Sequence, residues 1–355
     1  MKRNKLSDTL TWLQEKDGLD DSWLNHAKEI LQKQEPDSPW YVRLMIAFSA
    51  WITMILIIAF LILAGIVRSS EAALVIGLIT LPIAVGIHRN PDANEFKSQI
   101  SLALSLTGQG LVWFGLLQPT NITISSIAAI FISAGLIHLY ADPLHRFLST
   151  LIIITAMTVI ISDLRQHELY NALTIFCAFA IVGLLVYKDR FMNARWASIY
   201  TPVLYGLIVG LLLLLLPSSL HYGRYNKLHL VPGISTTGIG LALLYLQYQL
   251  LSTYKLAGAN LLTFLFALTT ALLIIATQAA PGILTALLII TIGFSRSQKS
   301  IEGLGMVFLV WYLSAWYYNM SSSLLEKSIS LSVAGLVLLA MAFWLNHYKP
   351  GEQSR

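Results

Sequence analysis

The stretch IYTPVLYGLIVGLLLLLL at residues 199–216 contains no Asp, Glu, Lys or Arg. A helix needs about 20 predominantly apolar residues to cross the hydrocarbon core of a bilayer, so this run predicts a transmembrane helix. Backbone polar groups find no water in lipid, and a helix satisfies them within the segment itself. The fold class indicated by this stretch is therefore all-α and membrane-embedded.

Similar apolar runs lie on both sides of this stretch, separated by short polar loops. They predict a polytopic transmembrane helix bundle of about twelve spans, of which the tenth has the weakest signal and could be re-entrant. The predicted spans are 44–66, 72–87, 100–117, 122–140, 146–162, 170–187, 199–216, 233–251, 258–277, 279–294, 303–319 and 328–345.

Composition indicates the same class of protein. Apolar residues make up 56% of the 355 residues and charged residues only 12%, whereas soluble globular domains carry about 25% charged residues. A soluble protein this poor in charge would lack the surface that keeps it in water. The formal net charge of +5 comes from Lys and Arg scattered among loops, which indicates membrane topology rather than a nucleic-acid partner.

The distribution of basic residues predicts the orientation of the spans. With a cytoplasmic N-terminus, 18 of the 23 Lys and Arg residues fall on the inner side and five on the outer side. Cytoplasmic loops are enriched in Lys and Arg, so both ends of the chain are predicted to be cytoplasmic. The predicted organisation is a short amphipathic cytoplasmic segment at 1–43, a transmembrane domain at 44–345 and a cytoplasmic tail at 346–355.

The middle of the predicted spans holds amides and small hydroxyls but no Asp, Glu, Lys or Arg. Charged groups at membrane depth usually mark function, so their absence speaks against a proton-driven pump, although not against a carrier of a neutral substrate. Gln109 lies in the small and polar stripe 101–110, and Gln247 lies in the eighth span. Each glutamine either lines a substrate path or makes an interhelical hydrogen bond, and the second reading is favoured.

A second polar group, on the inner side, consists of His138, Asp142 and His145. On an unbroken helix their spacing would put them on one side, where a divalent metal could bind. Pro143 disfavours helical geometry at Asp142, so an Asp-Pro helix start is the simpler interpretation. The metal reading is accordingly the weaker one.

Motifs of soluble enzymes are missing from the sequence, which has no GxSxG, HExxH, Walker A or GxGxxG pattern. The single cysteine, Cys177, can form no intramolecular disulfide and is interpreted as a packing residue. The chain is therefore expected to be no enzyme and to hold no cofactor. An intramembrane or interfacial enzyme stays open as a third class, with His138, Asp142, His88 and Asp92 as inner-side candidates.

Several segments are similar to those of a known family. They are Ser38-Pro-Trp-Tyr-Val-Arg43, Leu102-Ala-Leu-Ser-Leu-Thr-Gly-Gln109, Glu302-Gly-Leu-Gly-Met306, Ala315-Trp-Tyr-Tyr318 and Ser323-Leu-Leu-Glu-Lys-Ser328. On these segments the chain resembles DUF4401, a bacterial inner-membrane family catalogued as a domain of unknown function. Genes of the family tend to lie beside those of membrane-anchored GDYXXLXY-domain proteins, so the resemblance implies such a protein as a partner.

The resemblance points to Tyr317, Tyr318, Glu326 and Lys327 as candidate partner-contact residues. The tyrosine pair would lie at the outer interface, where amphipathic rings anchor a helix. The leading hypothesis is a non-enzymatic subunit of an inner-membrane complex. The alternative is a transporter or lipid-handling carrier for a neutral or amphipathic substrate, because twelve spans with both ends inside is a common carrier layout.

Overall fold

The computed structural model describes residues 40–90, 95–166, 168–188, 196–220, 232–253, 260–278 and 280–319, with residues 325, 328–329, 332, 336 and 339. The chain divides into two compact units, Met1–Thr53 and Met54–Arg355. The described part is all-α and comprises eleven helices. They are α3 (Trp40–Leu63), α4 (Ser70–Arg89), α5 (Glu95–Leu117), α6 (Ile122–Leu139), α7 (Pro143–Asp163), α8 (Glu168–Val186), α10 (Ala197–Leu220), α11 (Pro232–Thr253), α12 (Asn260–Ala276), α13 (Pro281–Ser295) and α14 (Lys299–Asn319).

Eleven of the twelve predicted spans coincide with these helices. Six consecutive helices in the described part, α4 to α8 and α10, are long and apolar enough to cross a membrane. The twelfth predicted span, 328–345, lies almost wholly outside the described residues. The count of twelve spans and the cytoplasmic position of both ends stay predictions.

Local sequence explains where the helices start and stop. The side chains of Ser69, Asn121 and Asp142 each accept a hydrogen bond from the backbone N–H three residues later, which caps α4, α6 and α7. Pro143 occupies the first turn of α7, where its missing N–H costs no helical bond. The interpretation of Asp142-Pro143 as a helix start is confirmed.

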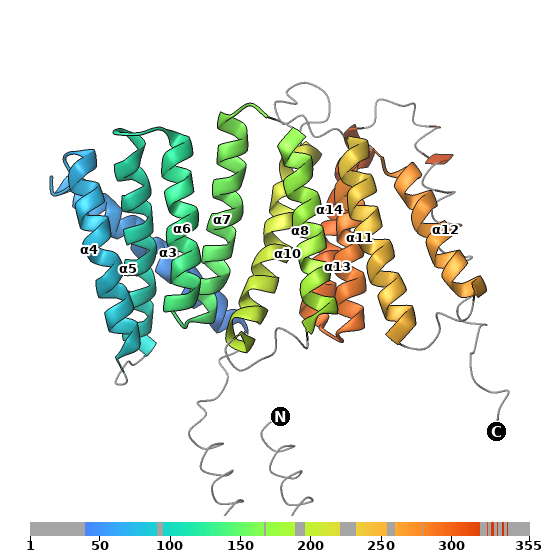
Figure 1. The fold of residues 1–355 in the computed structure, drawn as a ribbon, viewed down its shortest axis with the longest axis horizontal. Coiled ribbons are helices and arrows are strands. Elements are labelled where there is room, and N and C mark those ends of the chain that lie inside the picture. The colour runs from blue at the N-terminus through green and yellow to red at the C-terminus, as the bar shows by residue number, and fades with distance from the viewer. Residues whose placement is uncertain are drawn as a thin grey trace, which may run out of the picture. The chain divides into compact units, whose positions relative to one another are not determined.

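Helices α4 to α7 follow one another side by side (Figure 1), each packed on the next. Glycines allow α4 and α5 to come unusually close. A Cβ added at Gly115 would lie 2.6 Å from the backbone nitrogen of Leu74, and one added at Gly77 would lie 2.8 Å from that of Val112. Small residues at such contacts let helix backbones approach within a membrane.

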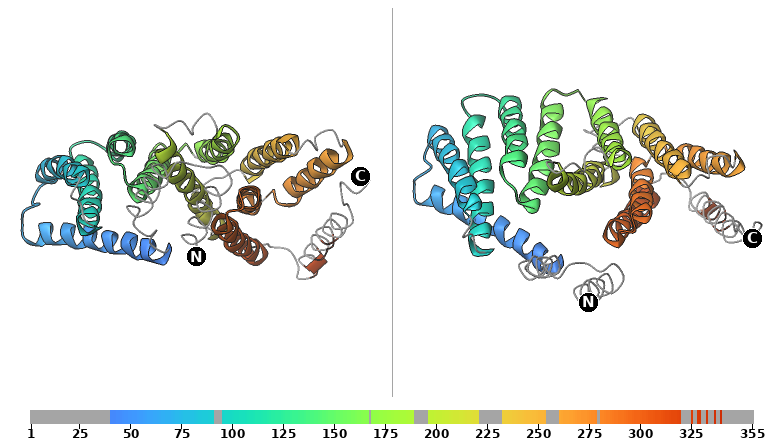
Figure 2. Two further views of the ribbon diagram at one scale, coloured as in Figure 1. Left: turned by 90° about the horizontal axis from the view of Figure 1, so that it is seen from below. Right: turned by 60° about the horizontal axis from the view of Figure 1, so that its bottom comes forward.

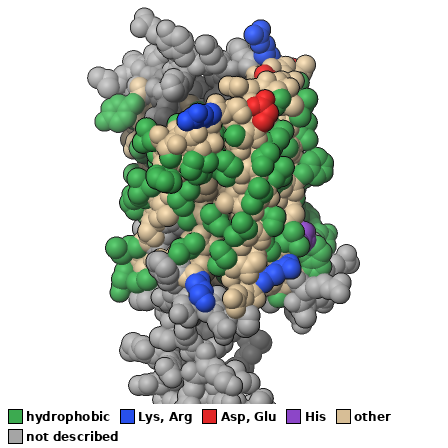
Figure 3. All heavy atoms as spheres, turned by 90° about the vertical axis from the view of Figure 1, so that its left-hand side faces the viewer, with side chains coloured by type: hydrophobic (Ala, Val, Ile, Leu, Met, Phe, Trp, Pro, Cys, Tyr) green, Lys and Arg blue, Asp and Glu red, His purple; other side chains and the backbone are tan. Residues whose placement is uncertain are grey.

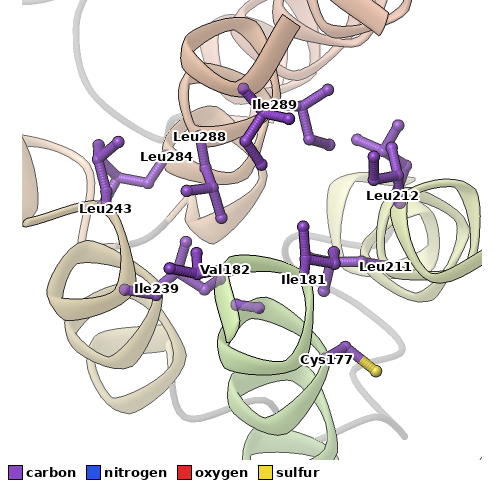
Figure 4. Packing of buried hydrophobic residues seen from close by; sticks show 14 of the residues in the cluster. Cys177, Ile181, Val182, Leu211, Leu212, Ile239, Leu243, Leu284, Leu288 and Ile289 are labelled. Atoms are coloured by element: carbon purple, nitrogen blue, oxygen red, sulfur yellow. The ribbon is translucent and has the colours of Figure 1, made fainter. Parts of the chain in front are cut away.

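The main apolar core lies among α8, α10, α11, α13 and α14. Figure 2 shows these helices grouped together, and each packs on at least two of the others. Figure 4 shows Ile181 and Val182 of α8 pointing toward Leu211 of α10, Ile239 of α11 and Leu284 of α13. Cys177 is 1% exposed and belongs to this core, in keeping with its interpretation as a packing residue.

The weakest predicted span corresponds to α13, which has 15 residues. At 1.5 Å per residue it extends about 22 Å, less than the hydrocarbon thickness of about 30 Å. Most of its side chains are buried, and it packs on α10, α11 and α14. Neighbouring helices thus surround this short helix on most sides.

The surface has the distribution of polarity that a bilayer requires. On the face drawn in Figure 3, hydrophobic side chains cover the middle, Lys and Arg side chains lie toward both ends, and Asp and Glu side chains lie toward the upper end. Large apolar side chains such as Phe131, Phe176 and Phe264 are exposed on helices. Exposed apolar side chains on helices of this length are what a membrane-embedded protein presents to lipid.

Candidate functional site

The described helices bury a group of polar side chains between α5, α6 and α7. Helix α5 presents Ser101, Ser105 and Gln109 at intervals of four residues, which puts them on one face over about 12 Å of helix. All the members of this group are buried, and we call the group the polar seam. It consists of Ser101, Ser105 and Gln109 of α5, Ser133 of α6, Tyr140 just beyond α6, and His145 and Ser149 of α7.

His145 is the centre of the polar seam and has no exposed surface. Its Nε2 lies 2.8 Å from the Ser105 hydroxyl and 3.3 Å from Nε2 of Gln109. Its Nδ1 lies 3.3 Å from the Ser149 hydroxyl, one turn further along α7. Both ring nitrogens of this histidine therefore have partners, and all of the partners are uncharged.

Gln109 extends the seam from α7 to α6. The Ser133 hydroxyl donates to Oε1 of Gln109 over 3.1 Å, while the amide nitrogen of Gln109 faces His145. One side chain of α5 thus bonds to both neighbouring helices. Gln109 thus makes interhelical hydrogen bonds, the favoured one of the two roles expected from the sequence.

Aromatic rings form the end of the seam. Tyr140 is stacked between His88 and His145, with ring centroids 4.1 Å and 4.2 Å away. Its hydroxyl lies 2.6 Å from the hydroxyl of Ser101, which donates to the carbonyl of Ala84 over 2.7 Å. His88 is half-buried in the last turn of α4, so the stack leads from a partly exposed ring to the buried His145.

Tyr140 lies between the spans α6 and α7, and its environment raises the pKa of its hydroxyl. Burial is the main cause, because the phenolate would lose its hydration. The hydrogen bond with Ser101 lowers the pKa in part, and the negative charge of Asp142 raises it. Tyr140 therefore stays neutral to a higher pH than a solvent-exposed tyrosine does.

Arg146 follows His145 in the chain but points its guanidinium away from the seam. Nε donates to the carbonyl of Ile137 over 2.9 Å, and Nη1 donates to that of Ser198 over 2.9 Å. Nη2 of Arg296 similarly donates to the carbonyl of Leu185 near the end of α8, over 2.7 Å. Through these bonds Arg146 joins α7 to α6 and α10, and Arg296 joins the end of α13 to the end of α8.

The pair Ser105 and His145 has the distance of a serine nucleophile and its base. Such a nucleophile also needs free donors that stabilise an oxyanion. Ser105 lies inside the unbroken helix α5, whose backbone N–H groups are engaged along the helix, and its side chain has no exposed surface. The geometry thus speaks against nucleophilic catalysis at this pair.

The inner-side group of the sequence is divided by the structure. His138 is exposed and its ring packs edge-on against Trp196. Asp142 caps α7 through the backbone N–H of His145, and only His145 enters the seam. The described residues contain no cluster of three metal-ligating side chains. Asp92 lies outside the described residues.

The remaining candidates lie away from the seam. Gln247 of α11 accepts a hydrogen bond from Thr270 of α12 over 3.0 Å. Tyr317 and Tyr318 stack edge-on in the last turn of α14, and Tyr318 is 79% exposed. Glu326 and Lys327 lie outside the described residues.

The sequence identified Gln109 and His145 as separate candidates but did not predict that their side chains contact each other. The usable signals were the four-residue spacing of Ser101, Ser105 and Gln109 on α5 and the small residues around them. The contribution of Ser133 and Tyr140 depends on how α6 packs on α5, which no local pattern specifies.

The family model described as Domain of unknown function (DUF4401) matches residues 39–348. This range contains every helix of the described part and the whole seam. Searches of curated proteins and of solved structures found no match.

Proposed function

Because the chain belongs to the DUF4401 family, whose function is not established, we propose a function from its own site: a membrane carrier that binds a small neutral substrate at the polar seam. The substrate class follows from the chemistry of the seam, which offers hydroxyl, amide and imidazole groups. We also propose that the chain lies in a bacterial inner membrane, with both ends in the cytoplasm.

The observation that supports this proposal is the convergence of three helices on His145. Buried polar side chains in a membrane are costly unless they are paired, yet seven of them gather between α5, α6 and α7. Interhelical hydrogen bonds in membranes are worth only about 0.6 kcal/mol on average. Bonds this weak can be exchanged for bonds to a substrate that carries hydroxyl or amide groups.

Neutral partners suit a neutral substrate. A charged substrate would lose its hydration on entering the seam and would need an opposite charge there. The nearest buried charge, Arg146, is bonded to the carbonyls of Ile137 and Ser198 and leaves the seam uncharged. The seam thus offers hydrogen bonds without an ion pair.

The test is solute flux into vesicles that contain the purified protein. Osmotic swelling in glycerol or urea gradients, followed by light scattering, should be faster than in protein-free vesicles and should fall to that baseline for Gln109→Met. Gln247→Met is the matched control, because it removes a half-buried glutamine whose bond to Thr270 joins α11 to α12. Equal swelling with wild-type protein and with empty vesicles across a panel of neutral polyols and amides would refute the proposal.

A second candidate function is that of a subunit in a complex with a membrane-anchored GDYXXLXY-domain partner. The observation that favours it is the tyrosine pair at the end of α14, where Tyr318 projects from the helix beside Tyr317. An exposed aromatic ring at a span end suits a protein contact as well as an interface anchor. Co-purification from native membranes distinguishes the two roles, because Tyr318→Ala should lose a partner only if one binds there.

A further inference from the structure

We propose that His145 is a proton-binding site within the span and that proton uptake reverses the hydrogen-bond chain from His145 through Gln109 to Ser133. The inference rests on the proposed carrier function and names the proton as the ion coupled to it, with His145 in place of the mid-span carboxylate that the sequence lacks. It follows from counting donors and acceptors along the seam.

The observed arrangement fits a neutral imidazole. The Ser133 hydroxyl donates to Oε1 of Gln109, so the amide nitrogen of Gln109 is the group that faces His145. An amide nitrogen only donates, and Nε2 of His145 therefore accepts and carries no hydrogen. The hydrogen of the neutral ring lies on Nδ1, which faces the hydroxyl of Ser149.

A proton taken from water onto Nε2 makes this arrangement untenable. The imidazolium has donors on both ring nitrogens, so the amide nitrogen of Gln109 would face another donor. Rotation of the Gln109 amide restores the pairing along the chain: Nε2–H of His145 donates to Oε1 of Gln109, and the amide nitrogen donates to Ser133 Oγ. The two bonds that run from His145 through Gln109 to Ser133 are kept in this change, and both change direction.

The reversal frees the hydroxyl hydrogen of Ser133, which no longer donates to Gln109. Seven residues earlier on α6, and thus on nearly the same face, the buried hydroxyl of Ser126 has no hydrogen-bond partner. The two serines are about 10 Å apart along the helix. The polar face of α6 therefore continues from the seam toward the other end of the span, where Thr123 donates to Asp163 of α7.

Charged and titratable groups face His145 from three elements. On its own helix Arg146 is the adjacent cation, and the Asp142 carboxylate lies at the helix start. Tyr140 stacks on the ring from the end of α6, and His88 of α4 stacks on the far side of Tyr140. The facing side chains of α5 are Ser101, Ser105 and Gln109, which do not titrate.

The two histidines make the stack a site for one positive charge. A single imidazolium over the face of Tyr140 gains a cation–π contact, whereas two would repel each other across one ring. The partly exposed His88 is the ring nearer to water. A proton can reside on either ring, and the Gln109 amide responds only when His145 holds it.

The test is ¹⁵N NMR of the histidine rings in the folded full-length protein in lipid nanodiscs. His145→Gln identifies the resonances, and the control His138→Gln removes the exposed ring that packs on Trp196. The proposal predicts that Nε2 of His145 changes from acceptor to protonated form as pH falls while the protein stays folded. The Gln109 side-chain amide signals should shift with the same midpoint.

A His145 ring that stays neutral until the protein unfolds would overturn the inference, and so would a titration that leaves the Gln109 signals unchanged. The coupling itself is tested in the vesicle assay by imposing a pH gradient. Solute flux that occurs but does not depend on the pH gradient would refute proton coupling without contradicting the proposed carrier function. If the His145 and Gln109 signals change with the same midpoint but no solute flux occurs, the carrier function is refuted and the proton-binding site is supported.

Discussion

Replacement of Gln109 by methionine is the perturbation whose cost the structure allows us to estimate. Methionine keeps the length of the side chain and the helix propensity, but it removes the bonds to Ser133 and His145. Intramembrane hydrogen bonds contribute about 0.6 kcal/mol each on average and up to about 1.7. Two such bonds give an expected loss of about 1.2 kcal/mol, with an upper bound of about 3.4 kcal/mol.

The matched variant is Gln247→Met. It removes one bond, to Thr270, so the expected loss is about 0.6 kcal/mol. The assay is reversible unfolding in mixed micelles with a rising fraction of dodecyl sulfate, followed by far-UV circular dichroism. A double-mutant cycle with Ser133→Ala should show that Gln109 and Ser133 are coupled.

The reasoning would be wrong if Gln109→Met cost no more than Gln247→Met, or if the cycle gave no coupling between Gln109 and Ser133. Either result would mean that the seam residues do not hold α5, α6 and α7 together. The seam would then have to be regarded as a set of separately satisfied side chains.

Other predictions concern packing, the partner surface and pH. Gly115→Ala should destabilise the protein by about 1–3 kcal/mol, because the new Cβ meets the backbone of Leu74; Gly135→Ala, where a Cβ meets nothing within 4 Å, should be neutral or stabilising by up to about 1 kcal/mol. Tyr318→Ala should leave membrane insertion and thermal stability unchanged, as measured by fractionation and melting, while it lowers recovery of any partner bound at α14. Because its environment raises the pKa of Tyr140, the contribution of this group to the free energy of unfolding is complete below about pH 10 and is lost as pH rises further. Tyr140→Phe should therefore reduce the loss of stability at alkaline pH.

Much of the fold follows from apolar periodicity and turn chemistry. The runs between polar loops predicted eleven helices close to their observed bounds, and Asp142-Pro143 located the start of α7. Span counting was less informative for α13, because a helix surrounded by other helices has no need of full membrane length. Its fifteen residues gave only a weak prediction of a transmembrane span, although it is among the most buried helices described.

The site was less predictable because it depends on packing. Gln109 and His145 were identifiable as polar residues within or beside spans, but their contact requires α5 and α7 to present them at the same depth. His138, Asp142 and His145 were interpreted as one group because they are close in the chain. The helix start at Pro143 separates them: His138 packs on Trp196, Asp142 caps α7 and His145 lies in the seam. Tyr140 sat at the predicted boundary of a span, and nothing local indicated that two histidines stack on it.

The central claim is that a substrate binds at the seam, which must open to admit it because its side chains are buried. Cysteine accessibility tests this claim most directly. The chain has one cysteine, Cys177, so Cys177→Ala supplies a cysteine-free background for Ser133→Cys in the seam and Leu212→Cys in the apolar core. Both positions have no exposed surface in the structure. We predict that a small uncharged thiol reagent modifies the cysteine at 133, that substrate changes the rate, and that the cysteine at 212 stays unmodified. If position 133 were as unreactive as position 212, the seam would be static packing and the carrier account would be contradicted.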